Sequence, residues 1–194
     1  MSVKQDIEMF VVGLLMDPQT NSPIVVLKDL NSDLCLPIWI GLSEATSIAT
    51  VLKKVDIQRP MTHDLLKDVI EQLGGRVLKV VITSLKENTF LANIEIVSGE
   101  ALNIIDARPS DAIALAVREE CPIIVSSDVI ANAKVTLIAV KAKDGASGDE
   151  QITFKNPNST GNDDSDTLNF STIEKEKWAE ILDSMDPEDF KYKM

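Results

Sequence analysis

One helix limits the folds open to this chain more than any other segment. Residues 106–117 run Asp-Ala-Arg-Pro-Ser-Asp-Ala-Ile-Ala-Leu-Ala-Val, and every side chain over 112–117 is apolar. A helix that is apolar on all faces has to be buried, so other layers of secondary structure must surround it. Asp106, Arg108 and Asp111 place two carboxylates and a guanidinium where a strand becomes this helix. Such charges are held in place and partly shielded from water, so the junction suits a functional site.

Hydrophobic periodicity predicts the remaining elements. Apolar runs and alternating patterns between turn sequences predict strands at residues 6–14, 23–30, 34–40, 76–84, 89–97, 100–107 and 123–125. Apolar residues spaced three and four apart predict helices from Ser43, from Thr62 as N-cap to a stop at Gly74-Gly75, over 109–120 and near 128–133.

The order of these elements is βββα, then α, then βββα, which suggests an internal duplication. With an offset of 67 residues, Glu44 and Asp111 become equivalent first-turn positions. The matching identities are few, so chance similarity remains open. In either case we expect an α+β fold, with a mostly antiparallel or mixed sheet covered by helices.

Composition divides the chain into three parts. Residues 1–140 form the expected α+β domain, whereas residues 141–170 are polar and turn-rich and are expected to be a flexible linker. In the acidic tail, residues 171–174 form a capping-box pattern that predicts a C-terminal helix within 171–194. Its apolar stripe comprises Trp178, Ile181, Leu182 and Met185, and it would dock on the domain or on a partner.

The charge balance restricts the partners. The chain of 194 residues carries 31 acidic and 19 basic side chains, for a net charge of −12. A protein that holds nucleic acid tightly through its phosphates is usually basic. Any contact with nucleic acid should therefore be weak or transient, through a local patch or bridging cations.

Other features favour a cytoplasmic location. The start of the chain lacks the apolar run of a signal peptide, and no segment approaches the length needed to cross a bilayer. Cys35 and Cys121 lie far apart in apolar surroundings without metal-ligand spacing, which favours reduced, buried thiols. No organic cofactor is expected, because no dinucleotide fingerprint or P-loop is present.

Two charged clusters offer the parts of a phosphodiester-hydrolysing site. The second cluster, residues 59–64, opens a helix and contains the chain's one histidine, His63, followed by Asp64. Arg108 could clamp a phosphate through two hydrogen bonds, and His63 could act as base or acid, because histidine titrates near neutrality. Asp64, Asp106 and Asp111 are the other candidate catalytic residues.

A divalent metal is the expected inorganic cofactor, if the site uses one. Asp106, Asp111 and Glu44 could hold Mg²⁺ or Mn²⁺, because these ions prefer oxygen ligands. A structural interpretation competes with this one. A carboxylate on a first helical turn stabilises the helix dipole without any catalytic role, and Arg108 with Asp106 or Asp111 could form a structural ion pair.

At these clusters the chain resembles the bifunctional nuclease (BFN-domain) family. The resemblance rests on three segments in the family's order, Leu36-Pro-Ile-Trp-Ile-Gly41, residues 59–66 (Arg-Pro-Met-Thr-His-Asp-Leu-Leu) and residues 106–115, and it extends over about residues 6–134. It implies an α+β domain, an oligomer, and the DNase and RNase activity of some members.

The first hypothesis is therefore a nuclease that cleaves DNA and RNA with little sequence preference, with or without metal assistance. The alternative is a non-enzymatic interaction or anion-binding module in which the same charges form a structural network. A third possibility is a regulator whose acidic tail competes with nucleic acid for the site. The buried helix and Trp39 suggest more apolar surface than one copy can hide, which predicts a homodimer.

Overall fold

Seven strands of a larger mixed sheet lie in the order β3-β2-β1-β7-β4-β5-β6. The computed structural model describes residues 5–17, 20–133, 136–142, 150–155 and 167–172. Neighbouring strands run antiparallel except β4 and β7, which are parallel. The strands are β1 (Ile7–Met16), β2 (Pro23–Lys28), β3 (Leu34–Trp39), β4 (Gly75–Lys86), β5 (Thr89–Ser98), β6 (Ala101–Ala107) and β7 (Ile123–Val125).

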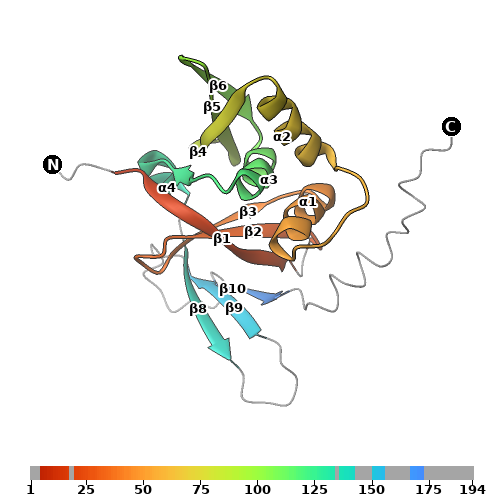
Figure 1. Ribbon diagram of the computed structural model, residues 1–194. Helices are drawn as coiled ribbons and strands as arrows, with labels where there is room; N and C mark the ends of the chain where they lie inside the picture. The colour runs from red at the N-terminus through yellow and green to blue at the C-terminus, as the bar shows by residue number, and fades with distance from the viewer. Residues whose placement is uncertain (1–4, 18–19, 134–135, 143–149, 156–166, 173–194) are drawn as a thin grey trace.

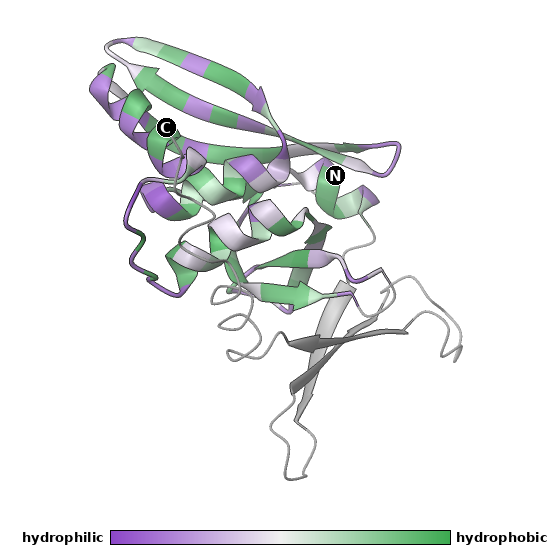
Figure 2. Ribbon diagram, turned by 90° about the vertical axis from the view of Figure 1, so that its right-hand side faces the viewer, coloured by the Kyte–Doolittle hydropathy of each residue, from purple (hydrophilic) through white to green (hydrophobic). Residues whose placement is uncertain are grey.

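Four helices accompany this sheet: α1 (Leu42–Leu52), α2 (Thr62–Gln72), α3 (Pro109–Glu119) and α4 (Ser127–Asn132). Helix α3 packs on β4 and β5, α1 packs on β2, and α1 and α3 pack on each other (Figure 1). Figure 2 shows helices lying between two parts of the sheet, one that carries β4–β6 and one that carries β1–β3. These two parts of the sheet thereby enclose α3, whose apolar residues 112–116 have almost no exposed surface.

Side-chain alternation explains the β4–β5 hairpin. Val80, Ile82, Ile94 and Ile96 are buried on the face that receives the helices, while most of the residues between them are partly exposed. The two residues of the turn, 87 and 88, both have positive φ, at 47° and 65°. This is the backbone of a type I′ turn, whose twist matches that of the paired strands.

The α+β architecture and all the elements expected up to residue 133 are confirmed, with small shifts at their ends. The internal duplication is not confirmed. One boundary is corrected: Met61, not Thr62, occupies the N-cap of α2, and its N–H donates to the Asp64 carboxylate at 2.8 Å.

The expected linker contains regular structure. Strand β8 (Thr136–Ala142) pairs with β3, β9 (Glu150–Lys155) pairs with β8, and β10 (Thr167–Thr172) pairs with β9 and with the end of β1. Residues 151–155 and 167–170 alternate between polar and apolar side chains, which is the period of a strand. Polar, turn-rich runs flank both segments. The C-terminal helix lies outside the described residues, apart from residues 171 and 172, which end β10.

Trp39 and the two cysteines can be placed as well. Trp39 is half exposed, and its indole N–H donates to the Asp17 carboxylate at 3.1 Å. Cys35 and Cys121 are free thiols, and burial raises the pKa of each to about 11. Among the described residues, none of the helices combines the length and the apolar character required to span a bilayer.

Candidate functional site

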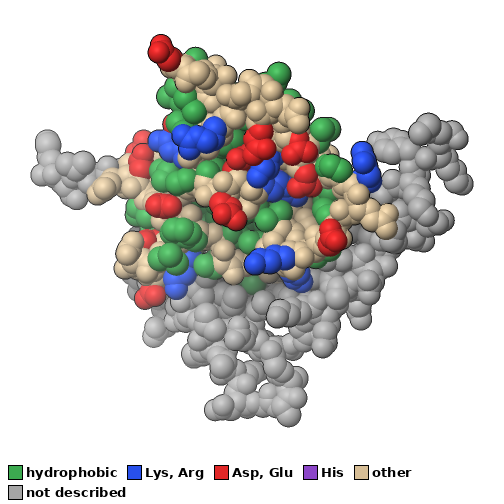
Figure 3. All heavy atoms as spheres, in the orientation of Figure 1, with side chains coloured by type: hydrophobic (Ala, Val, Ile, Leu, Met, Phe, Trp, Pro, Cys, Tyr) green, Lys and Arg blue, Asp and Glu red, His purple; other side chains and the backbone are tan. Residues whose placement is uncertain are grey.

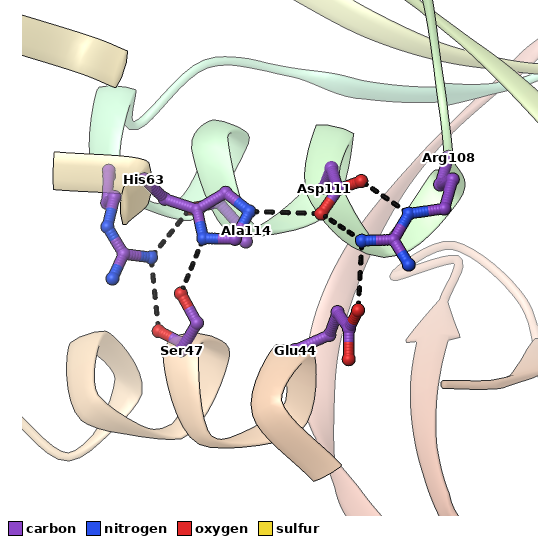
Figure 4. Close-up of polar contacts among 7 residues, drawn as sticks. Glu44, Ser47, His63, Arg108, Asp111 and Ala114 are labelled. Atoms are coloured by element: carbon purple, nitrogen blue, oxygen red, sulfur yellow. Dashed lines mark hydrogen bonds and ion pairs between the residues drawn. The ribbon is translucent and has the colours of Figure 1, made fainter. Parts of the chain in front are cut away.

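Three helices bring their charged residues together at one place (Figure 4). Helix α3 begins where β6 ends: Arg108 is its N-cap, with extended backbone, and Pro109 fills the first helical position. Proline is favoured there because its ring fixes φ and its missing N–H would have no partner in the helix. Asp111 follows on the first turn, and α1 and α2 pack against α3 with Glu44 and His63 on their own first turns.

Arg108 is the most accessible charged group of the cluster. Its Nε and Nη2 donate to the two oxygens of Asp111 at 2.7 and 2.9 Å, and Nη2 also contacts Glu44 Oε1 at 2.9 Å. Its Nη1 makes no hydrogen bond within the described part of the chain, and the side chain is 65% exposed. These contacts with Asp111 and Glu44 raise the pKa of Arg108. The guanidinium is thus held in a fixed orientation with one nitrogen available.

Asp111 is shared between Arg108 and His63. Its Oδ1 lies 3.2 Å from His63 Nε2. Partial burial acts to raise the pKa of Asp111, but the hydrogen bonds from Arg108 and His63 outweigh it, so the pKa is lowered. Asp111 is therefore a carboxylate at neutral pH and accepts from both neighbours.

His63 has partners at both ring nitrogens. Its Nδ1 lies 2.9 Å from the Ser47 hydroxyl, and its side chain is 12% exposed. In a neutral ring that donates a hydrogen bond from Nε2 to Asp111, Nδ1 accepts a hydrogen bond from the Ser47 hydroxyl. The three residues resemble a Ser-His-Asp arrangement, but Ser47 is buried and cannot reach a substrate. In this arrangement His63 orients Asp111 and has no free nitrogen to act as a base.

A buried arginine, Arg118, holds together the three helices that carry the cluster. Arg118 Nε donates to Asp64 Oδ1 at 2.7 Å, and its Nη1 donates to the carbonyl oxygens of Ser47 and Ala114 at 3.0 and 2.9 Å. Burial acts to raise the pKa of Asp64, but the bonds from Arg118 and from the Met61 N–H outweigh it and lower the pKa. Arg118 therefore ties α2 and α1 to α3.

The structure brings together four of the six candidate residues, Glu44, His63, Arg108 and Asp111. Asp64 lies beside them and faces Arg118. Asp106 makes no hydrogen bond or ion pair with the other five in the described structure, because it lies on β6 opposite Asn93, on the sheet face away from the buried Ala92.

Sequence reasoning missed Ser47 and Arg118. Ser47 lies one helical turn after Glu44, and Arg118 lies two turns after Asp111 in an otherwise apolar helix. A charged residue at position 118 of a buried helix indicates an ion pair, because a buried charge requires a partner.

The proposed ligands do not fit a divalent metal as they are arranged. Within the described ranges, no three His, Cys, Asp or Glu side chains lie close enough together to hold an ion. Glu44 and Asp111 are both bound to Arg108, whose positive charge lies between them, and Asp106 is elsewhere.

A hollow of about 470 Å³ opens beside the cluster, between the end of α1, the loop before α2 and the start of α2. Asp64 and Arg118 line it together with Lys54 and Arg59. Figure 3 shows acidic and basic side chains next to each other in the centre of the face that carries α1, α2 and α3. This face can offer hydrogen-bond donors to an anion, although it is not uniformly basic.

Fold and site together define an α+β domain with an arginine-centred charge cluster at the first turns of three helices. The chain belongs to the bifunctional nuclease domain family, whose model matches residues 25–137. An uncharacterized protein of Mycobacterium tuberculosis is 36% identical over 184 residues, which are 95% of this chain and 98% of that protein.

Plant proteins named as bifunctional nucleases are more distant. Bifunctional nuclease 1 of Oryza sativa is 29% identical over 121 residues, 61% of this chain and 37% of the rice protein. Bifunctional nuclease 1 of Arabidopsis thaliana is 30% identical over 114 residues, 57% of this chain and 35% of the plant protein. The similarity to these proteins therefore covers about a third of their length.

Proposed function

We propose that this chain is a nuclease that hydrolyses phosphodiester bonds in DNA and RNA with low sequence specificity. Membership of the bifunctional nuclease family supports this proposal. The structural observation that carries it is Arg108, an exposed guanidinium at the start of a buried helix, held by Glu44 and Asp111 with Nη1 available. A preorganised guanidinium is suited to the oxygens of a phosphate, where charge develops during hydrolysis.

The proposed mechanism begins when a phosphate oxygen binds Nη1 of Arg108 and the Glu44 carboxylate separates from Nη2. Its bidentate contact with Asp111 keeps the guanidinium in place, and Asp111 is itself oriented by His63. The released Glu44 carboxylate then accepts a proton from water, whose oxygen forms the new bond to phosphorus. The bond from phosphorus to the leaving sugar oxygen breaks, and that oxygen takes a proton from solvent.

Binding of nucleic acid is expected to be weak in this proposal. The two carboxylates on Arg108 and the net charge of −12 both oppose a polyanion. Lys54 and Arg59, which line the neighbouring hollow, supply the nearby positive charge. We place the activity in the cytoplasm, because the free thiols of Cys35 and Cys121 are suited to a reducing compartment.

A second candidate is a non-enzymatic anion-binding or interaction module. The observation that favours it is the completeness of the network: Arg108, Asp111 and His63 are all paired with one another or with Glu44 and Ser47. In such a module the charges position the three helices, and an anion binds at Arg108 without being cleaved.

An assay of purified protein separates the two candidates. Wild type, Arg108→Ala and Asp111→Asn are incubated with plasmid DNA and with total RNA, in EDTA, Mg²⁺ or Mn²⁺. Arg76→Ala is the matched control, because Arg76 is an exposed arginine on β4 outside the cluster. The nuclease proposal predicts cleavage by wild type and control, and loss in the two site variants while both remain folded at the assay temperature. Equal cleavage by all four preparations would indicate a contaminating nuclease and contradict the proposal.

A further inference from the structure

A second group of charges lines the hollow between the end of α1 and the start of α2. Arg118, which lines this hollow, follows Arg108 by ten residues of α3, so their Cα atoms lie roughly 15 Å apart along the helix. The volume of about 470 Å³ falls within the range of roughly 300–1,000 Å³ that is typical of small-molecule pockets. The hollow is therefore large enough for a small ligand and is separate from Arg108.

Arg118 brings positive charge without a complete set of partners to the hollow. Its side chain is 3% exposed, and its Nε and Nη1 donate to Asp64 and to two carbonyl oxygens. Nη2 is also buried, and it has no hydrogen-bond partner among the described residues. A buried donor of this kind is destabilising unless an acceptor offsets its charge. An anionic group in the hollow would do so, because Arg118 lines it.

The end of α1 adds Lys54 to the lining. The helix ends in a Schellman motif, in which the Lys54 N–H donates to the Val51 carbonyl oxygen at 3.0 Å and the Val55 N–H donates to that of Thr50 at 2.9 Å. Lys54 has the left-handed backbone of this motif, with φ of 51°, where glycine is the usual residue. The turn places both Lys54 and Val55 at the hollow.

The charges at the hollow are of both signs and are not paired with one another. Lys54, Arg59, Asp56 and Asp68 all line it, and none of the four forms an ion pair within the described residues. Lysine and arginine bind phosphate oxygens, whereas aspartate accepts hydrogen bonds from the amino group of a nucleobase. The hollow therefore offers partners for both ends of a nucleotide.

Apolar side chains complete the lining. Val55, Ile57 and Pro60 line the hollow and belong to the loop that joins α1 to α2 on the outside of the molecule (Figure 1). All three are exposed, and so are the other residues from 53 to 60. The flat face of a nucleobase packs against apolar side chains. An apolar wall beside cations suits a nucleotide better than a bare inorganic anion.

We propose that this hollow binds a nucleoside 5′-phosphate unit. The phosphate lies at Lys54 and Arg59, and the base packs on Val55 and Ile57. The unit is a free nucleotide or one residue of a single strand, because a base within a duplex is paired and stacked. Such binding does not require hydrolysis, so it goes beyond the proposed nuclease activity and does not depend on it.

Isothermal titration calorimetry of the full chain with 5′-AMP, in EDTA, tests the proposal. We expect a dissociation constant on the order of 0.1–1 mM, because the neighbouring carboxylates offset part of the attraction. Arg59→Ala should weaken binding at least ~10-fold, the usual effect of losing a hydrogen bond to a charged group. Adenosine, which lacks the phosphate, should bind more weakly by a similar factor. Arg76→Ala is the matched control, because Arg76 is an exposed arginine on β4 that does not line the hollow.

Lys54→Gly separates binding from stability. Glycine adopts the left-handed backbone without steric cost, so the melting temperature should stay the same or rise. Binding of AMP should nevertheless weaken several-fold, a combination that a purely structural role of Lys54 would not produce. Ile57→Ser should also weaken AMP binding, whereas Leu73→Ser should not, because Leu73 is an exposed leucine outside the hollow.

A short oligo(dA) with phosphorothioate linkages, as a single strand and as a duplex with oligo(dT), identifies the source of the nucleotide. A hollow that holds one residue of a strand binds the single strand at least as tightly as AMP, and more tightly than the duplex. Arg59→Ala then weakens the binding of the single strand as well. Binding of AMP without binding of the single strand identifies a free nucleotide as the ligand.

Two results would overturn the proposal. Equal affinity of wild type, Arg59→Ala and Lys54→Gly for AMP would place the nucleotide elsewhere, for example at Arg108. The absence of both binding heat and a rise in melting temperature at ~10 mM AMP, well above the expected dissociation constant, would show that the hollow does not accept a nucleotide.

Discussion

The ion pair between Arg118 and Asp64 gives the most quantitative prediction. Arg118 is only 3% exposed, and it connects Asp64 of α2 to two carbonyl oxygens, one on α1 and one on α3. Asp64→Asn leaves the guanidinium buried without its counter-charge. Breaking a buried pair in this way costs about 3–5 kcal/mol, and we expect about 3 kcal/mol here, because solvent screens the partly exposed carboxylate.

Arg118→Met should be less costly. It removes the ion-paired hydrogen bond to Asp64 and two hydrogen bonds from the guanidinium to neutral carbonyl oxygens, but it also removes Nη2, which is buried without a partner among the described residues. Losing the bonds destabilises the fold, whereas removing the buried, unpaired Nη2 stabilises it. The two effects partly cancel, which leaves a net destabilisation of about 2 kcal/mol. Once the guanidinium is absent, Asp64→Asn should add little. The double variant should therefore cost about 2–3 kcal/mol, far less than the sum of the single variants.

Urea denaturation of the wild type, the two single variants and the double variant measures this coupling. A destabilisation of about 3 kcal/mol moves the midpoint by at least ~1 M at ordinary m-values. The account predicts a coupling free energy of about 2 kcal/mol between the two sites. Additive single effects, agreeing with the double variant within about 0.5 kcal/mol, would show that the pair does not act as a unit.

Three further predictions concern the site and the core. Gly41→Ala places a methyl group against the Glu44 carboxylate, so it should reduce cleavage several-fold with little change in melting temperature. The pKa values of Asp64 and Asp111 are lowered in the folded state, so the unfolding free energy should be largest above about pH 4 and fall as the pH drops through those folded values, which urea midpoints at several pH values would show. Leu115→Ala, in the buried α3, should cost about 2–5 kcal/mol in urea denaturation.

Each of these predictions has a contrary outcome. Wild-type cleavage by Gly41→Ala would mean that the Glu44 position does not matter for the reaction. In Asp64→Asn the unfolding free energy should fall less steeply as the pH drops. An unchanged pH profile in that variant would show that Asp64 does not cause the loss of stability in acid. A cost below about 1 kcal/mol for Leu115→Ala would show that α3 is not tightly packed.

The fold up to residue 133 was largely predictable because its signals are local. Strand alternation and helix periodicity identify β1–β7 and α1–α4. The all-apolar stretch of α3 identifies it as the helix buried between the two parts of the sheet. Periodicity cannot say what covers an amphipathic face. Leu65, Leu66, Val69 and Leu73 of α2 have a core-like spacing, yet the structure leaves them exposed.

The candidate site was predictable in part for the same reason. Charges on first helical turns point to Glu44, His63 and Asp111. Glu44 and Asp111 meet at Arg108, and His63 meets Asp111. The choice of partners was not predictable, because it depends on how α1 and α2 pack on α3. Ser47, for example, is an ordinary helix residue in the sequence, and only the tertiary fold places its hydroxyl at the His63 ring.

Arg108, which holds the phosphate, is the residue on which the proposed activity depends most. The direct measurement is the single-turnover cleavage rate of a single-stranded oligonucleotide by Arg108→Ala and by the control Arg76→Ala, with melting temperatures recorded for both. The account predicts at least a ~100-fold loss for Arg108→Ala, the usual effect of removing one transition-state donor, and a wild-type rate for the control. Cleavage by Arg108→Ala at the wild-type rate would contradict it.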